Sequence, residues 1–146
     1  MSTSTTSDAA KLSRTFEHSV CIRESHLDTF GHVNNAVYLQ LFEEARWEIV
    51  TAGGYGLKRV HELQIGPTLL DVHMRFRHEI VNREVIKIQT WVASVDGKKM
   101  TFRQVMINNR GEEACVADFL IGLFDLKKRK LIEPTADWKR AIGLDS

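Results

Sequence analysis

The sequence predicts an α+β domain in which one long helix packs on an antiparallel sheet. Residues 35–51 carry apolar side chains at three- and four-residue spacing, the period of a helix with one buried face. Four later stretches have the alternation or β-branched content of strands and are separated by turn signals; they are 70–80, 85–95, 98–108 and 113–125. A single helix followed by strands joined through short turns favours a helix layered on an antiparallel sheet.

A first strand and a loop precede the helix. Alternation from Phe16 to Ile22 indicates a strand over residues 16–24, and residues 25–34 form a loop. Asn34 or Asn35 is the expected N-cap, because an Asn side chain accepts from unpaired helix N–H groups. The apolar stripe consists of Tyr38, Leu41, Phe42, Ala45 and Ile49. Gly53 and Gly54 end the helix.

The remaining elements follow from local patterns. Residues 60–65 fit neither period, and Pro67 favours a strand edge or a strand start. Asp96-Gly97 predicts a type I′ hairpin turn between two strands, and the nearly continuous apolar run 119–124 predicts a central strand. A basic run at 127–130 and a short terminal helix containing Trp138 close the chain.

Length and composition indicate one domain. A chain of 146 residues suits a single domain over 16–146, preceded by a flexible tail over 1–15. A net charge of +1 argues against nucleic-acid binding, which requires a basic face. The sequence has no apolar run long enough to span a membrane and no signal peptide at its start, so we expect a cytoplasmic protein without membrane partners. Cys21 and Cys115 lack CxxC spacing and are expected as reduced, buried thiols.

One motif gathers polar groups at the start of the helix. Residues 28–38 read Asp-x-x-Gly-His-Val-Asn-Asn-x-x-Tyr. This order directs unpaired N–H donors and the positive end of a helix dipole to a point beside the Asp28 carboxylate. The motif and the following Phe42-Glu-Glu-Ala-Arg46 resemble the hotdog-fold acyl-CoA thioesterases of the 4-hydroxybenzoyl-CoA thioesterase type, and the likeness covers residues 16–126.

This resemblance implies a fold, an activity and an assembly. The fold is a five-stranded antiparallel sheet wrapped around one long central helix, with a short C-terminal helix. The activity is hydrolysis of acyl-CoA to a free carboxylic acid and CoA, without a cofactor, since CoA is part of the substrate. The assembly is a homodimer or a dimer of dimers with sites at subunit interfaces. No metal is expected, because the six histidines show no compact ligand spacing.

The resemblance also implies roles for the motif residues. Asp28 is the general base or the nucleophile, and the backbone N–H of Asn35 is an oxyanion donor. His32 either orients Asp28 or a water molecule, or is only a local hydrogen-bonding residue. Gly31 supplies a positive φ or a close substrate approach. The other substrate-binding positions are Val33, Asn34 and Tyr38.

Several alternatives remain open on the sequence alone. Taken by itself, Asp28 reads as a helix cap or as an acceptor for loop amides. A related hotdog branch uses a helix glutamate, which makes Glu43 and Glu44 rival bases. The fold also serves thioesterases acting on acyl carrier protein and non-catalytic acyl-CoA- or protein-binding modules, and an intact Asp28 counts against a module. Phosphate-binding candidates are Arg83, Lys98, Lys99, Arg103 and residues 127–130, and Tyr38, Phe42 or Trp47 could contact the acyl group.

Overall fold

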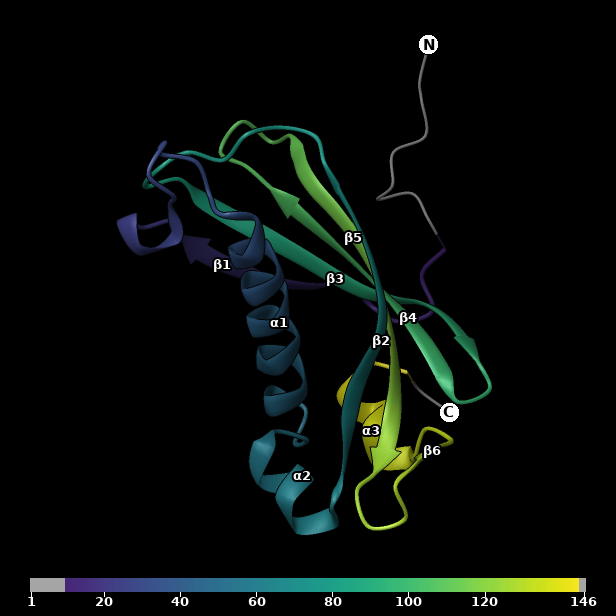
Figure 1. Cartoon of the computed structure of the whole chain (residues 1–146). Helices are drawn as coiled ribbons and strands as arrows, with labels where there is room; N and C mark the ends of the chain where they lie inside the picture. Colours follow the sequence, from purple (N-terminus) through teal and green to yellow (C-terminus); the bar gives the residue numbers. More distant parts are fainter. Residues whose placement is uncertain (1–9, 145–146) are drawn as a thin grey trace.

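The computed structural model describes residues 10–144 and shows an antiparallel sheet with α1 on one face (Figure 1). The strand order is β1-β3-β4-β5-β2, and β6 pairs with β5. The strands are β1 Phe16–Cys21, β2 Ile65–Phe76, β3 Val85–Asp96, β4 Lys99–Ile107, β5 Glu113–Asp125 and β6 Lys130–Ile132. The helices are α1 Asn35–Ala52, α2 Leu57–Leu63 and α3 Ala136–Ala141, with a 3₁₀ turn at Glu24–His26. The predicted α+β class is therefore confirmed.

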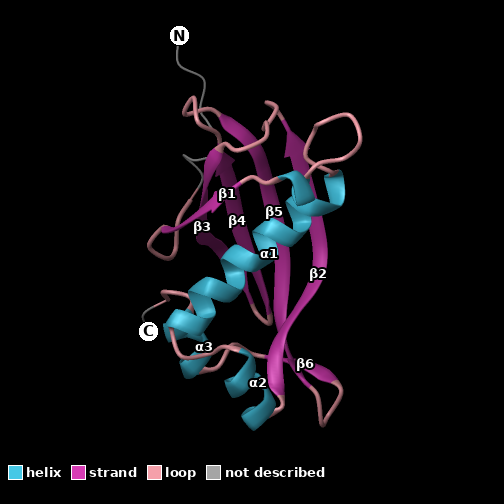
Figure 2. Cartoon of the chain, turned by 90° about the vertical axis from the view of Figure 1, so that its left-hand side faces the viewer, coloured by secondary structure: helices cyan, strands magenta, loops and turns pink. Residues whose placement is uncertain are grey.

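The long helix forms where its apolar period predicted and buries the predicted stripe. Asn34 is the N-cap, and its Oδ1 accepts from the Ala36 N–H at 2.9 Å. The whole stripe from Tyr38 to Ile49 is buried, and Phe42 and Ala45 are fully inaccessible. Figure 2 shows this helix lying diagonally across the sheet. The stripe packs in one core cluster with strand residues such as Ile88, Phe102 and Phe119.

The sheet confirms the predicted central position of β5, which pairs with β4 on one side and with β2 on the other. The predicted β3–β4 hairpin is also present, with Asp96 opposite Lys99 and a two-residue loop of Gly97 and Lys98. Its turn differs from the predicted type I′. Gly97 has φ +61°, while Lys98 is not among the residues of positive φ, so the geometry is that of type II′.

Strand β2 and the segment before it differ from the prediction in their boundaries. Strand β2 begins at Ile65 and ends at Phe76, rather than spanning 70–80, and contains a register shift between Leu69 and Asp71. Pro67 is tolerated because β2 is an edge strand, where an N–H is not needed for pairing. Most of the ambiguous stretch 60–65 belongs to α2, which ends at Leu63 and is followed by Gln64 as its C-cap with φ +57°.

The ends of the chain also differ from prediction. Part of the expected flexible tail pairs with the sheet: the Leu12 N–H donates to Val92 O at 2.8 Å, and the Val92 N–H donates to Ser13 Oγ at 2.9 Å. The Lys11 ammonium lies 4.3 Å from the Trp91 ring centroid. Residues 1–9 of that tail lie outside the described residues. Beyond the basic run, β6 adds a sixth strand to the five predicted.

Within the described part of the chain, no helix is both long and apolar enough to cross a membrane.

Candidate active site

A closed loop carries the first half of the motif. An isolated bridge between Leu27 and Val33 closes residues 28–32, and the Asp28 N–H donates to His32 O at 2.8 Å. Gly31 has φ +82°, and a Cβ added there would meet no atom within 4 Å. The backbone conformation, rather than crowding, therefore requires glycine at this position. This agrees with the positive φ expected for Gly31.

The Asp28 carboxylate divides its two oxygens between two environments. Oδ1 accepts from the Phe30 N–H at 2.9 Å and from the His32 N–H at 3.2 Å, so Asp28 does satisfy loop amides. Oδ2 accepts no hydrogen bond from any residue between 10 and 144. One oxygen is therefore held in place, while the other remains available for chemistry.

The start of α1 presents one unpaired backbone donor. The Ala36 N–H bonds to the Asn34 side chain at 2.9 Å, and the Val37 N–H bonds to Asn34 O at 2.9 Å. The Asn35 N–H, at the first helical position, has no acceptor among the described residues. It lies at the positive end of the helix dipole, where developing negative charge is stabilised.

The remaining motif residues divide into buried and exposed ones. Val33 and Tyr38 are 5% and 7% exposed, and the Tyr38 ring meets Phe76 edge-on at 4.9 Å. Burial raises the pKa of the Tyr38 phenol. The His32 imidazole is exposed and forms no hydrogen bond within residues 10–144. The structure thus brings Asp28, Gly31 and the His32 backbone together, but does not join the imidazole to the carboxylate.

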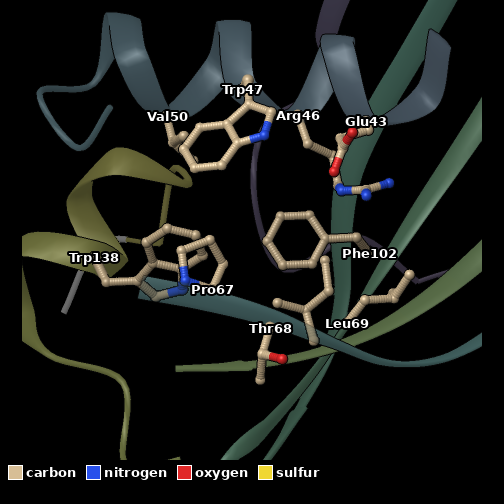
Figure 3. Close-up of a pocket in the computed structure, with 10 residues that line it drawn as sticks. Glu43, Arg46, Trp47, Val50, Pro67, Thr68, Leu69, Phe102 and Trp138 are labelled. Atoms are coloured by element: carbon tan, nitrogen blue, oxygen red, sulfur yellow. The ribbon is translucent and has the colours of Figure 1, made fainter. Parts of the chain in front are cut away.

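The two rival helix glutamates have different surroundings. Glu44 Oε2 lies 2.9 Å from His18 Nε2, which links α1 to β1. Glu43 instead lines a cavity of about 80 Å³ beside the second half of α1 (Figure 3).

That cavity is separate from the Asp28 loop within one chain. None of the seven predicted site residues lines it; its lining comprises Glu43, Arg46, Trp47, Val50, Pro67, Thr68, Leu69, Phe102, Ile121 and Trp138. At about 1.5 Å of rise per helical residue, Glu43 lies roughly 12 Å along the axis from Asn35. Of the expected acyl contacts, Trp47 lines the cavity, whereas Tyr38 and Phe42 do not.

Arg46 enters the cavity wall from a polar network between helix and sheet. Its Nη1 donates to Gln104 Oε1 at 2.8 Å, and the guanidinium lies 4.3 Å from the Phe119 ring centroid. The Gln104 Nε2 donates to Phe42 O and Thr90 Oγ1, both at 3.0 Å. Burial lowers the pKa of Arg46 to about 10. The sequence signal for this network was a glutamine at an inward position of an alternating strand.

Two of the candidate phosphate-binding residues already pair with carboxylates. Arg83 bonds to Glu24 through Nε and Nη2, and these bonds, with one from Asn82, lower the pKa of Glu24 to about 2. Arg103 forms a bidentate pair with Asp118, with both distances 2.7 Å. The other candidates, Lys98, Lys99 and residues 127–130, lie at the end of the sheet opposite the Asp28 loop (Figure 1).

No group of three or more metal-ligating side chains gathers within residues 10–144.

Comparison with known proteins identifies the family. Residues 22–142 match the model of the Thioesterase-like superfamily, and the chain belongs to this family. The long-chain acyl-CoA thioesterase FadM of Escherichia coli K12 is 31% identical over 114 residues, which cover 76% of this chain and 84% of FadM.

Solved structures share the fold at low sequence identity. A Staphylococcus aureus protein, SAV2348, solved in complex with CoA, superposes with a TM-score of 0.82 at 16% identity, covering 92% of this chain and 85% of that one. A DHNA-CoA thioesterase from the same species gives 0.78 at 20% identity, covering 87% of each chain. The hotdog fold expected from the sequence is thereby confirmed.

Proposed function

We propose that this protein hydrolyses acyl-CoA to a free carboxylic acid and CoA, with Asp28 as the base or nucleophile. Membership of the Thioesterase-like superfamily and the likeness to FadM support the reaction class. The observation that supports the site is the arrangement of polar groups at the N-terminus of α1. There, a carboxylate with one oxygen available stands in the same motif as the unpaired Asn35 N–H.

The chemistry follows from these two groups. Acting as base, Asp28 Oδ2 takes a proton from water while the water oxygen attacks the thioester carbon. Acting as nucleophile, Oδ2 attacks that carbon directly, and water hydrolyses the resulting anhydride. The carbonyl oxygen gains negative charge, which the Asn35 N–H stabilises by about 3 kcal/mol, as one oxyanion donor typically does. The C–S bond then breaks and CoA leaves as a thiolate.

The other motif residues support this arrangement. Gly31 holds the loop that aims Asp28, and Asn34 caps the helix and keeps its first N–H groups in register. Val33 and Tyr38 anchor the loop and the first turn of α1 in the core, which fixes the site on the sheet. The exposed His32 imidazole is placed to meet water or the substrate.

We further propose that two copies pair through β2. This strand is bonded to β5 on one side only, and it exposes Leu69, Leu70 and Phe76 at 46%, 40% and 52%. The free edge of a 12-residue strand that exposes apolar side chains favours pairing with another chain. Antiparallel pairing of two β2 strands around a twofold axis would place the Asp28 loop of one subunit near the cavity end of the other. The same proposal extends to a dimer of such dimers.

The test is CoA release, measured with a thiol reagent, across short-chain, long-chain and aromatic acyl-CoAs. We expect Asp28→Asn to lower kcat by at least about a hundredfold, because it removes the base or nucleophile. Its amide oxygen still accepts from the Phe30 and His32 N–H groups, so the loop is preserved. Glu43→Gln tests the rival helix glutamate and should retain turnover on straight-chain acyl-CoAs.

Each alternative has its own outcome in this assay. Loss of turnover in Glu43→Gln but not in Asp28→Asn would transfer the role to the helix glutamate. Absence of turnover on every acyl-CoA, followed by activity on acyl carrier protein thioesters, would replace the substrate class. Inactivity on both carriers would leave a binding module.

A further inference from the structure

The cavity beside α1 contains a cation without an acidic partner. A guanidinium has five N–H donors. Within residues 10–144, the Arg46 guanidinium makes one hydrogen bond, to Gln104, and no ion pair with a carboxylate. Burial lowers the pKa of Arg46, and the charge of Glu43 on the same lining offsets only part of this lowering and forms no salt bridge with it. Among the described residues, no buried side-chain nitrogen or oxygen lacks a hydrogen-bond partner, so the remaining Arg46 nitrogens are accessible rather than sealed in the core. They are therefore free to donate to an acceptor that enters the cavity.

The guanidinium is also fixed in position. Gln104 is fully buried, and its Nε2 is held by two acceptors, so its Oε1 faces Arg46 in one orientation. The guanidinium also lies over the Phe119 ring, which holds it in a cation–π contact. Such a preorganised donor binds a ligand acceptor with little loss of conformational freedom.

The rest of the cavity suits an apolar group. Trp47, Phe102 and Trp138 contribute aromatic surface, and Val50, Pro67, Leu69 and Ile121 contribute aliphatic surface (Figure 3). Its volume of about 80 Å³ is roughly half that of an apolar cavity known to hold benzene, about 150 Å³. It therefore takes the end of a larger ligand rather than a whole one.

The charges in the lining decide which end group fits best. Arg46 offers donors and Glu43 offers an acceptor, so their formal charges cancel. A second carboxylate entering the cavity would meet Glu43, whereas a hydroxyl can accept from Arg46 and donate toward Glu43. A methyl end would leave the Arg46 donors without partners.

On the basis of the proposed acyl-CoA hydrolysis, we propose that this cavity binds the end of the acyl group remote from the thioester, and that Arg46 makes the enzyme prefer an end bearing a hydroxyl over a methyl end. Arg46 then acts as a specificity residue. This role concerns substrate choice and is independent of whether Asp28 acts as base or nucleophile.

The experiment compares straight-chain acyl-CoAs with their ω-hydroxy counterparts at several chain lengths. At the best length, wild type should show a kcat/KM for the ω-hydroxy substrate at least about tenfold above that of its parent, since a site built for a hydrogen bond rejects the analogue lacking it. Arg46→Met, which keeps an unbranched apolar stem, should bring this ratio to about one or below. Arg46→Lys should retain part of the preference, and Asp28→Asn should lower both rates without changing their ratio.

Direct binding gives a second readout that needs no turnover. Trp47 and Trp138 line the cavity, while Trp91 lies in a separate cluster with its indole N–H bonded to Ala10 O. Titration with free ω-hydroxy acids should quench tryptophan fluorescence at lower concentrations than the parent acids do. Trp47→Phe should reduce the amplitude of the quenching.

The outcomes separate this inference from the proposed function. Turnover with equal preference in wild type and Arg46→Met would overturn the role of Arg46 while leaving the hydrolase intact. Absence of turnover together with selective binding of ω-hydroxy acids would overturn the hydrolase and leave the role of Arg46 intact. If Arg46→Met fails to fold, wild-type binding still decides, because equal affinity for the two kinds of acid contradicts the inference.

Discussion

Replacing Asn35 with proline tests the proposed oxyanion donor directly. Proline lacks an N–H, and the first position of a helix tolerates it because that N–H has no partner inside the helix. The preceding residue, Asn34, already has φ −65° and ψ 139°, the extended geometry that a residue before proline adopts. The cap bond from the Ala36 N–H to Asn34 Oδ1 does not involve the lost group. The substitution therefore removes one donor and leaves the helix intact.

The expected effect is large on catalysis and small on stability. Loss of one oxyanion donor costs about 2.7–4 kcal/mol of transition-state stabilisation, or roughly 10²–10³ in kcat. The free energy of unfolding should change by less than about 1 kcal/mol, because no intramolecular hydrogen bond is lost. Steady-state kinetics of CoA release and urea denaturation measure the two quantities on the same preparation.

The control is Asn35→Ala, which removes the side chain but keeps the N–H. It should retain wild-type kcat within a fewfold. A stable Asn35→Pro protein with near-normal turnover would refute the oxyanion role. Equal losses in both variants would assign the effect to the Asn35 side chain instead.

Three further predictions concern stability and assembly. Gln104→Leu should lower the free energy of unfolding by about 2–4 kcal/mol, because the half-buried Arg46 loses its acceptor and Phe42 O and Thr90 Oγ1 lose their donor. Arg46→Met in the same chain should recover the part of that loss that comes from Arg46, as measured by urea denaturation. Glu24 has a pKa lowered from 4.5 to about 2 in the folded state, so stability supported by Arg83 should be complete above pH 4.5 and decline as pH falls toward 2, with a flatter profile in Glu24→Gln. Phe76→Lys should yield monomers in sedimentation velocity, because a charge on the apolar edge of β2 opposes strand pairing.

Each of these has an outcome that contradicts it. Strictly additive costs for Gln104→Leu and Arg46→Met would deny their coupling. An unchanged acid profile in Glu24→Gln would place the acid sensitivity in other carboxylates. For the proposed β2 pairing, the matched control is His73→Lys, which places a lysine on the opposite face of the same strand. Dissociation by both variants would point to a general effect of charge.

The sequence predicted features that depend on local patterns. The helix, its Asn34 cap and the central strand β5 follow from periodicity and side-chain chemistry over neighbouring residues. The turn type at Gly97 depends on which two residues form the loop. Because Asp96 pairs with Lys99, the loop is Gly97-Lys98, whereas the prediction took it to be Asp96-Gly97. The boundaries of β2 depended on its edge position, which is a property of the whole sheet. Neither could be obtained from local periodicity.

Of the candidate site, the sequence predicted the part that is continuous in the chain and not the part that tertiary packing assembles. The Asp28 loop is continuous in sequence, so the motif located it directly. The Arg46 cavity combines residues from α1, β2, β4, β5 and α3, whose contacts depend on tertiary packing. Arg46 and Gln104 are 58 positions apart, and a bond between them has no local signature.

The bonds to Asp28 Oδ1 have an evolutionary consequence. Because the Phe30 and His32 amides depend on that oxygen, natural selection has a structural reason to retain Asp28 that is independent of turnover. A descendant that gave up hydrolysis and kept only ligand binding would still lose loop stability on replacing it with an apolar residue. Retention of Asp28 is therefore weaker evidence for activity than the motif alone suggests. Asparagine is the informative substitution, since it keeps an acceptor for both loop amides while removing the proposed base or nucleophile.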